Sequence, residues 1–272
     1  MTTTLSPRAI PAARRASALY CASNGGGTPL LLVHGLGVSG AVFDPLVPTL
    51  SARYQTLTPD LRGHGQSRRL PSPDNIERLA ADLENLLDIL GISSCYALGY
   101  ASGGAVVQQL ARRQPQRLRG VALVCAQAHS TGSIREQIER RLRPELFRLL
   151  GGSGMGRLAA HTGCPRGTPP EAYDFVRETM ATNDGRRVAP VARSLQGFDS
   201  RSWLHEITCP ALVVGGAADP TTPAHHAHEL AAGLPHAELH MIPGAGHWLV
   251  KTHTQALLDL LTGWLERQEA RA

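Results

Sequence analysis

Two residues toward the end of the sequence, Asp219 and His247, are of types that perform acid–base chemistry. Each lies in a glycine-containing turn, at 215–220 and 243–248, that follows an apolar, strand-like run. A histidine accepts a proton from a hydroxyl or a water, and an acid beside it orients the ring and stabilises its charged form. Taken singly, Asp219 could be a helix N-cap and His247 an ordinary loop residue. Their joint spacing favours a catalytic pair.

A third turn, at residues 98–104, is placed to supply a nucleophile but carries the wrong residue. Its sequence, LGYASGG, lies between a strand-like run and a helix-like run. A nucleophile elbow has the form G-x-S-x-G, because the turn is strained and crowded. Aligned on Gly99 and Gly103, the central position is Ala101, and Ser102 comes one residue later. Successive side chains of a tight turn point in different directions, so we do not expect Ser102 to replace the missing serine.

A fourth turn, at residues 32–37, is glycine-rich and also follows a strand-like run. Glycines let backbone N–H groups approach a developing negative oxygen, as an oxyanion hole requires. Alone, the pattern fits an ordinary turn equally well.

The elements that must position these turns alternate along the chain. Strand-like runs occur at 29–33, 54–58, 95–98, 121–125, 211–214 and 237–242, and helical spacing occurs at 75–90, 105–113 and 255–266. This alternation implies βαβ units, so the expected fold class is α/β, with a mostly parallel, doubly wound sheet. Open sheets of this kind bind ligands beyond the carboxyl ends of their strands, where these turns should meet.

Residues 127–205 interrupt the pattern and are expected to form a helical cap inserted into a core made of residues 1–126 and 206–272. The cap shows helical spacing at 134–150 and 171–180, separated by a Gly- and Pro-rich stretch at 151–170. It carries four more arginines than acidic residues, out of a net charge of +5 for the chain. A basic cap could steer a carboxylate-bearing substrate, or it could be a solvated helical face. Several apolar residues could line an acyl pocket or form the core of the cap, namely Leu146, Phe147, Leu149, Leu150 and Met155.

These turns together resemble the α/β-hydrolase superfamily, over nearly the whole chain except the cap. The turns that carry the resemblance are at 32–37, 60–67, 99–104, 211–220 and 243–248. The segments at 197–201, 204–210 and 215–223 are similar to 3-oxoadipate enol-lactonases and related small esterases.

The resemblance implies a serine hydrolase of carboxylic esters or lactones, with a small-molecule substrate. It implies a triad on positions 101, 219 and 247 and oxyanion donors from the N–H groups of Leu36 and Ser102. Further residues implied on the substrate side are Gly35, Tyr100 and Trp248. No metal or organic cofactor is implied. The sequence departs from the family at Ala101, at Tyr100, where histidine is frequent, and at 251–253, where an acidic residue and a proline are common.

Ala101 leaves several hypotheses open, because removing such a serine costs on the order of a million-fold in turnover. The chain could be an inactivated variant in which the serine of an active hydrolase was replaced, or a natural non-catalytic member that binds a ligand or a partner. Alternatively, His247 could act on water or on a substrate proton without a covalent step. A C–C bond hydrolase of meta-cleavage products is the closest enzymatic alternative.

Composition excludes several other classes of protein. Aromatic residues make up 4% of the chain and its basic residues form no single run, so we expect no nucleic-acid partner.

The five cysteines form no C-x-x-C pair, and those at 95, 125 and 209 are expected to be reduced and largely buried. No run is long enough to span a bilayer and residues 1–17 do not resemble a secretory signal, so we expect a cytoplasmic protein without membrane contact.

Histidines elsewhere in the sequence are expected to be structural. His225, His226 and His228 would need a further carboxylate or thiolate to hold a metal, so a solvated helix is the favoured interpretation. His64 lies in a loop shared across the superfamily, and we expect it to support structure rather than catalysis.

Overall fold

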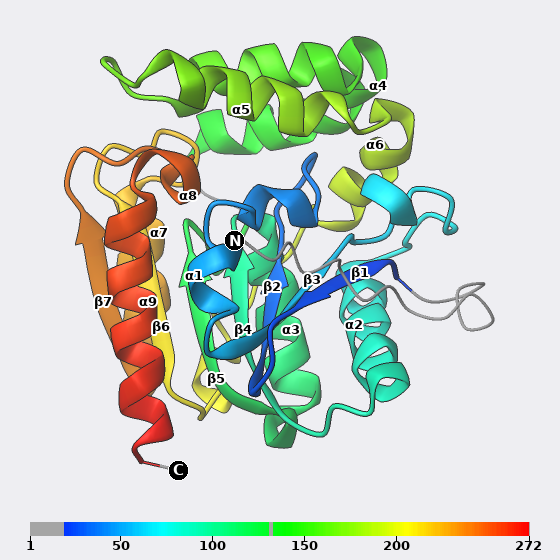
Figure 1. Cartoon of the computed structure of the whole chain (residues 1–272). Helices are drawn as coiled ribbons and strands as arrows, with labels where there is room; N and C mark the ends of the chain where they lie inside the picture. Colours follow the sequence, from blue (N-terminus) through cyan, green and yellow to red (C-terminus); the bar gives the residue numbers. More distant parts are fainter. Residues whose placement is uncertain (1–18, 131–132, 272) are drawn as a thin grey trace, which may run out of the picture.

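The computed structural model describes residues 19–130 and 133–271, and it confirms the expected α/β fold (Figure 1). The described strands form one seven-stranded sheet in the order β1-β3-β2-β4-β5-β6-β7. Their bounds are β1 (Cys21–Asn24), β2 (Thr28–Val33), β3 (Tyr54–Pro59), β4 (Cys95–Tyr100), β5 (Leu118–Val124), β6 (Ala211–Gly216) and β7 (Ala237–Ile242). Only β1 pairs antiparallel with its neighbour among these described strands; all the other pairs are parallel. The edge strand β1 has no counterpart in the sequence prediction, because four residues are too few to show alternation.

The parallel register brings the turns predicted to carry chemistry to one edge of the sheet. Val33 at the end of β2 is level with Gly99 in β4, and Tyr100 is level with Val124 at the end of β5. Val124 in turn is level with Val214 in β6. The chain segments that follow β2, β4, β5 and β6 therefore leave the sheet side by side.

Helices cover both faces of the sheet, as a doubly wound fold requires. One buried apolar cluster joins the sheet to α2 (Ile76–Leu90), α3 (Ser102–Arg113) and α7 (Ala224–Gly233). A second cluster joins the opposite face to α1 (Val47–Leu50), α8 (Leu249–Thr252) and α9 (Thr254–Glu269). Short 3-10 turns lie at η2 (Gly40–Phe43), η3 (Gly65–Ser67), η4 (Pro115–Arg117) and η5 (Leu204–Glu206).

The helix α2 shows how local sequence sets these elements. The Asn75 side chain accepts a hydrogen bond of 3.0 Å from the N–H of Arg78 and so caps the helix start. Gly91 ends the helix in the left-handed conformation, with φ 69°. Between them, the apolar residues at helical spacing, Leu79, Leu83 and Leu86, are fully buried.

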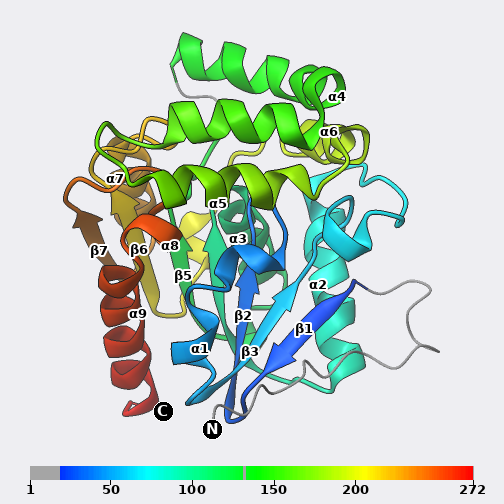
Figure 2. The same cartoon turned by 45° about the horizontal axis from the view of Figure 1, so that its top comes forward.

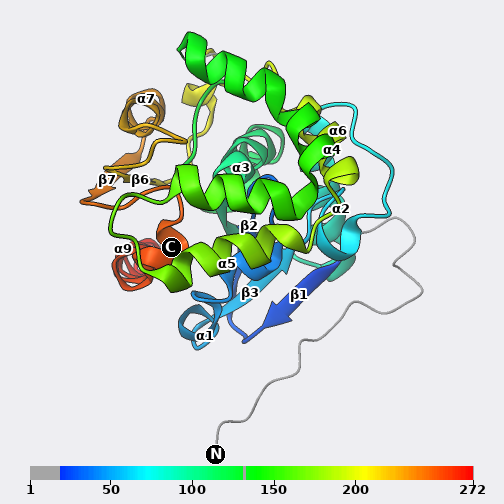
Figure 3. The ribbon, with the colours of Figure 1, turned by 90° about the horizontal axis from the view of Figure 1, so that it is seen from above.

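The cap, defined here as α4 (Ile134–Gly163), α5 (Pro170–Ala181) and α6 (Gly185–Ser194), follows β5 and precedes β6. Its helices lie across the carboxyl ends of the strands, as Figure 2 shows with the top of the molecule tilted forward and Figure 3 from above. The apolar cap residues divide: Phe147 and Met155 are buried, whereas Leu149 is 78% exposed and Leu150 is 46% exposed.

The Gly-rich part of the cap is helical, which corrects the prediction that residues 151–170 separate two helices. Gly151 has φ 62° and kinks α4, but the helix resumes at once and continues to Gly163. A Cβ at Gly152 would lie 2.2 Å from the carbonyl oxygen of Asn183, and one at Gly156 would lie 2.9 Å from that of Arg177. These glycines therefore let α4 pack closely against the segment around α5, where larger residues would not fit.

All five cysteines are free, and Cys209 is only partly buried. No helix within residues 19–130 and 133–271 is long and apolar enough to cross a membrane. The expectation for residues 1–17 lies outside the described residues.

Candidate active site

Asp219 and His247 form the hydrogen-bonded pair that their spacing predicts. Asp219 lies in the turn after β6 and His247 in the turn after β7, and Oδ2 of the acid is 2.8 Å from Nδ1 of the imidazole. The same carboxylate accepts hydrogen bonds from the N–H groups of Thr221 and Thr222, at 2.7 and 3.0 Å, and from the Thr222 hydroxyl at 2.6 Å. Thr222 is a partner that the sequence reasoning did not single out.

The surroundings of Asp219 keep it ionised. Burial alone would raise its pKa, but His247 and the donors of Thr222 outweigh burial and hold the pKa below the ordinary aspartate value. An ionised Asp219 accepts the Nδ1 proton of His247. The other ring nitrogen, Nε2, is then the one that can accept a proton from a hydroxyl or a water.

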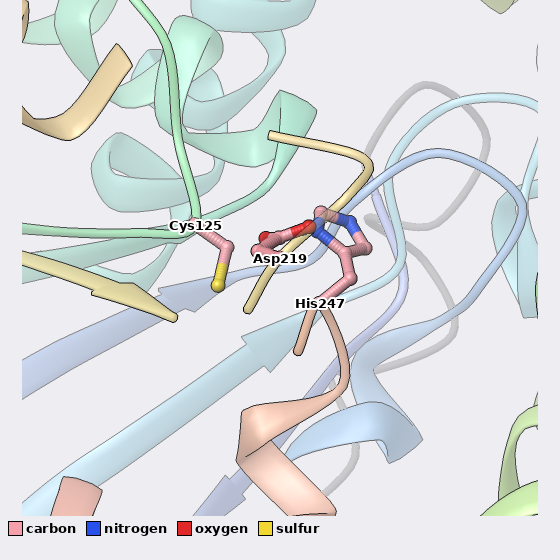
Figure 4. Close-up of side chains that lie close together, drawn as sticks. All are labelled: Cys125, Asp219 and His247. Atoms are coloured by element: carbon pink, nitrogen blue, oxygen red, sulfur yellow. The ribbon is translucent and has the colours of Figure 1, made fainter. Parts of the chain in front are cut away.

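Cys125 lies beside this pair (Figure 4), in the turn after β5. One ligand atom from each of Cys125, Asp219 and His247 lies within 4.8 Å of the others. Burial, and then the negative charge of Asp219, raise the pKa of the thiol well above its usual range. Because a thiol in that state stays protonated, it is a poor nucleophile and a poor metal ligand.

The turn between β4 and α3 has the backbone of a nucleophile elbow. Ala101 has φ 51° and ψ −122°, a conformation that costs a residue with a side chain about 1–3 kcal/mol. The crowding around it requires glycine at the flanking positions. A Cβ at Gly99 would lie 2.5 Å from the Cα of Gly104, and one at Gly103 would lie 2.3 Å from the carbonyl oxygen of Val33. The turn is therefore forced by the close approach of β2, β4 and α3.

The Ala101 side chain faces the glycine-rich turn after β2. A Cβ at Gly35 would lie 3.0 Å from the Cβ of Ala101, so Gly35 leaves room for a side chain at position 101. The N–H groups of Leu36 and Ser102 donate no hydrogen bond within the described part of the chain. Ser102 also begins α3, where the helix dipole favours a negative charge. Both residues line one cavity of about 510 Å³.

Two buried histidines shape the backbone of the turn after β2. His34 Nδ1 lies 2.7 Å from the Gly35 carbonyl oxygen, and its Nε2 accepts a hydrogen bond of 2.8 Å from the N–H of Leu61. His64 Nε2 accepts a hydrogen bond of 2.9 Å from the N–H of Gly37. Burial lowers the pKa of His34 to about 4 and that of His64 to about 3, so both rings are neutral. The contacts of His64 are those of a structural residue.

Asn183, between α5 and α6, ties the cap to the same turn. Its Nδ2 donates to the Gly37 carbonyl oxygen at 3.1 Å, and its Oδ1 accepts from the N–H of Gly65 at 2.8 Å. The side chain is buried. Sequence reasoning missed this residue, because nothing near position 183 shows that it meets a turn 146 residues away.

Tyr100 and Trp248, which the sequence places on the substrate side, pack against the turn that carries His247. Tyr100 is buried, and its hydroxyl donates to the His247 carbonyl oxygen at 2.7 Å. Its ring stacks on the imidazole of His247, with centroids 5.6 Å apart. Trp248 is also buried, and its Nε1 donates to the Ala159 carbonyl oxygen in α4 at 3.3 Å. Both residues position the turn that carries His247.

The cavity lies between the elbow and the cap. Its lining from the cap includes the apolar residues Ile134 and Ile138 and the basic residues Arg140 and Arg143. Burial lowers the pKa of both of these guanidinium groups, and Glu139 partly opposes this effect at Arg143. The cavity thus combines apolar surface with partly desolvated positive charge.

Comparison with known proteins identifies the family to which this fold belongs. The family model described as alpha/beta hydrolase fold matches residues 28–148 and 178–254. The chain belongs to the α/β-hydrolase family.

Among solved structures, this α/β hydrolase is similar to a thermophilic esterase from Thermogutta terrifontis, solved with malate bound. The two share 26% identity and a TM-score of 0.86 over 97% of this chain and 99% of that one. It is also similar to the enol-lactonase from Burkholderia xenovorans LB400, with 25% identity and a TM-score of 0.82 over 91% and 96% of the two chains. A curated relative, the magnesium-chelatase 30 kDa subunit of Rhodobacter capsulatus, is 31% identical over 88% of this chain and 87% of that protein.

Proposed function

We propose that this chain carries the machinery of a serine hydrolase of carboxylic esters or lactones, with alanine at the nucleophile position. The observation that carries the proposal is the backbone of Ala101, with φ 51° and ψ −122°. An alanine gains nothing from this strained conformation, which instead serves to present a side chain at the tip of an elbow. The remaining parts are the hydrogen-bonded acid and histidine, and the N–H groups of Leu36 and Ser102, which have no partner among the described residues.

With serine at position 101, each part would have a defined role. His247 Nε2 would take the hydroxyl proton as the oxygen attacks the carbonyl carbon, and Asp219 would stabilise the imidazolium. The N–H groups of Leu36 and Ser102 would hold the oxyanion. His247 would then return the proton to the leaving oxygen and later activate water to release the acyl group. With a methyl group at position 101, no acyl-enzyme forms.

The test is hydrolysis of a panel of p-nitrophenyl esters and lactones by the chain itself and by Ala101→Ser. We expect turnover by the variant to exceed that of the parent by several orders of magnitude, up to about a million-fold. Ala101→Ser combined with His247→Ala should be inactive, whereas Ala101→Ser combined with Ser102→Ala should keep its activity. A folded Ala101→Ser variant that hydrolyses nothing on the panel would favour a non-catalytic, ligand-binding member. Full activity of the parent chain would favour a non-covalent role for His247.

We further propose that the substrate carries a carboxylate, because Arg140 and Arg143 both line the cavity. Both side chains are partly buried, and partly buried guanidinium groups attract anions more strongly than fully exposed ones, since water screens them less. In the Ala101→Ser background, Arg143→Gln should raise KM about tenfold for a carboxylated lactone and leave KM for its methyl ester unchanged. Arg148→Gln is the matched control, because Arg148 is on the same helix but exposed. Equal effects of both variants would argue against a carboxylate site.

A further inference from the structure

A second group of metal-binding side chains lies where the cap joins the core. His129 lies between β5 and α4, Glu136 lies in the first turn of α4, and His226 and Glu229 lie on α7. The prediction of a solvated helix carrying three histidines is wrong for His226, which is fully buried, although its neighbours at 225 and 228 are exposed. The carboxylates beside His226 are Glu229, on its own helix, and Glu136, in the cap.

His129, His226 and Glu229 are spaced for a common ion. One ligand atom from each of the three lies within 4.8 Å of the others. His129 Nε2 is 2.9 Å from Glu229 Oε2, and the two histidine rings have centroids 5.4 Å apart. Tetrahedral zinc with bonds of 2.0–2.1 Å places its ligand atoms about 3.3 Å apart. Small side-chain rotations would therefore bring the three donors onto one ion.

One polar atom in this group is buried without a partner. Within the described part of the chain, His226 Nδ1 has no hydrogen-bond partner, whereas Glu229 Oε2 lies against the His129 ring at 2.9 Å. A buried ring nitrogen is rarely left in this state, because it has lost its contact with water without gaining a partner. Its lone pair is one that a cation would satisfy.

Glu136 fixes His226 in the form that binds a metal. His226 Nε2 is 3.1 Å from Glu136 Oε1, so the ring proton is on Nε2 and Nδ1 keeps its lone pair. Glu136 is itself held by the N–H of Ser133, at 2.6 Å. A carboxylate on the far nitrogen of a histidine ligand is the usual support in zinc sites.

The other groups of potential ligands are less suitable. The oxygens of Asp219 beside Cys125 already accept four hydrogen bonds. The set formed by Glu136, His225 and His226 uses a carboxylate that already accepts from Ser133 and an exposed histidine.

We propose that His129, His226 and Glu229 bind a divalent metal ion, with Glu136 supporting His226 and the remaining coordination position open to water. Two imidazoles and one carboxylate are a donor set typical of zinc. The ion would join the segment leading into α4 to helix α7, and so fasten the start of the cap to the core. It would stabilise the native chain, because the three ligands come together only on folding.

The test uses the untagged full chain, stripped with EDTA and titrated with Co²⁺ and with Zn²⁺. We expect one equivalent of Co²⁺ to give tetrahedral d–d bands without a thiolate charge-transfer band, and Zn²⁺ to raise Tm. His226→Gln and Glu229→Gln should each abolish both effects, and His228→Gln, on an exposed position of the same helix, should abolish neither. Circular dichroism checks that each variant is folded.

Four outcomes would overturn the proposal. They are no uptake by the parent chain, uptake unchanged in a folded Glu229→Gln variant, a thiolate charge-transfer band, and loss of uptake in His225→Gln but not in His129→Gln. The last outcome would assign the ion to the set containing Glu136 and His225. A thiolate band would assign the ion to a cysteine instead.

Discussion

The hydroxyl of Tyr100 donates a hydrogen bond of 2.7 Å to the backbone carbonyl of His247, a residue 147 positions later in the chain. Tyr100 directly precedes Ala101, so the elbow and the histidine turn are fixed to each other through this bond. The stacked rings of Tyr100 and His247 add a second contact between the same two turns. The arrangement of the site therefore does not depend on the side chain at position 101.

Tyr100→Phe tests this link. The variant leaves a buried carbonyl oxygen without its donor, so we expect the free energy of unfolding to fall by about 1–3 kcal/mol. In the Ala101→Ser background, turnover should fall more than KM rises, because the ring of His247 is less well positioned. Urea unfolding and steady-state kinetics measure the two effects. The prediction is wrong if the variant matches its parent in both.

Asn183→Ala tests whether the cap positions the oxyanion turn. The change removes the bonds to the Gly37 carbonyl and the Gly65 N–H, so the turn at 34–37 should become less rigid. In the Ala101→Ser background we expect kcat to fall about tenfold or more with little change in KM, because oxyanion donors act mainly in the transition state. Thr182→Ala, at an exposed neighbouring position, should have a much smaller effect. An unchanged kcat would mean that the cap only covers the site.

The two buried histidines predict acid sensitivity. His34 and His64 have an ordinary pKa of 6.5 but titrate at about 4 and about 3 in the folded chain. Below pH 6.5 the unfolded chain therefore binds protons that the folded chain does not. Their contribution to stability is full above that pH and is lost as the pH falls toward the folded values, by about 1.4 kcal/mol per histidine for each pH unit.

Urea unfolding as a function of pH measures this effect. The slope of the unfolding free energy against pH should be reduced in His64→Gln, since the amide can replace the hydrogen bonds of the ring but does not titrate. His228→Gln, at an exposed position, should leave the slope unchanged. A parent chain equally stable across this pH range would contradict the assignment of neutral, buried rings.

The residues that the sequence located correctly are those whose signal is local. The elbow at 99–103 lies at the end of a strand, and Asp219 and His247 follow strands within a few residues. Parallel strands bring such turns to one edge of the sheet. The burial of His226 could not be predicted, because its partner Glu136 is 90 positions away. The helical nature of 151–163 was missed for a similar reason, since those glycines are explained by packing against another helix rather than by their own propensity.

The most direct test of the central claim is covalent labelling with a fluorophosphonate, followed by peptide mass spectrometry. The account predicts that Ala101→Ser gains one label, on the introduced serine, that the parent chain gains none, and that His247→Ala abolishes the labelling of the variant. A folded Ala101→Ser variant that takes up no label, or a label on Ser102 in the parent chain, would contradict it.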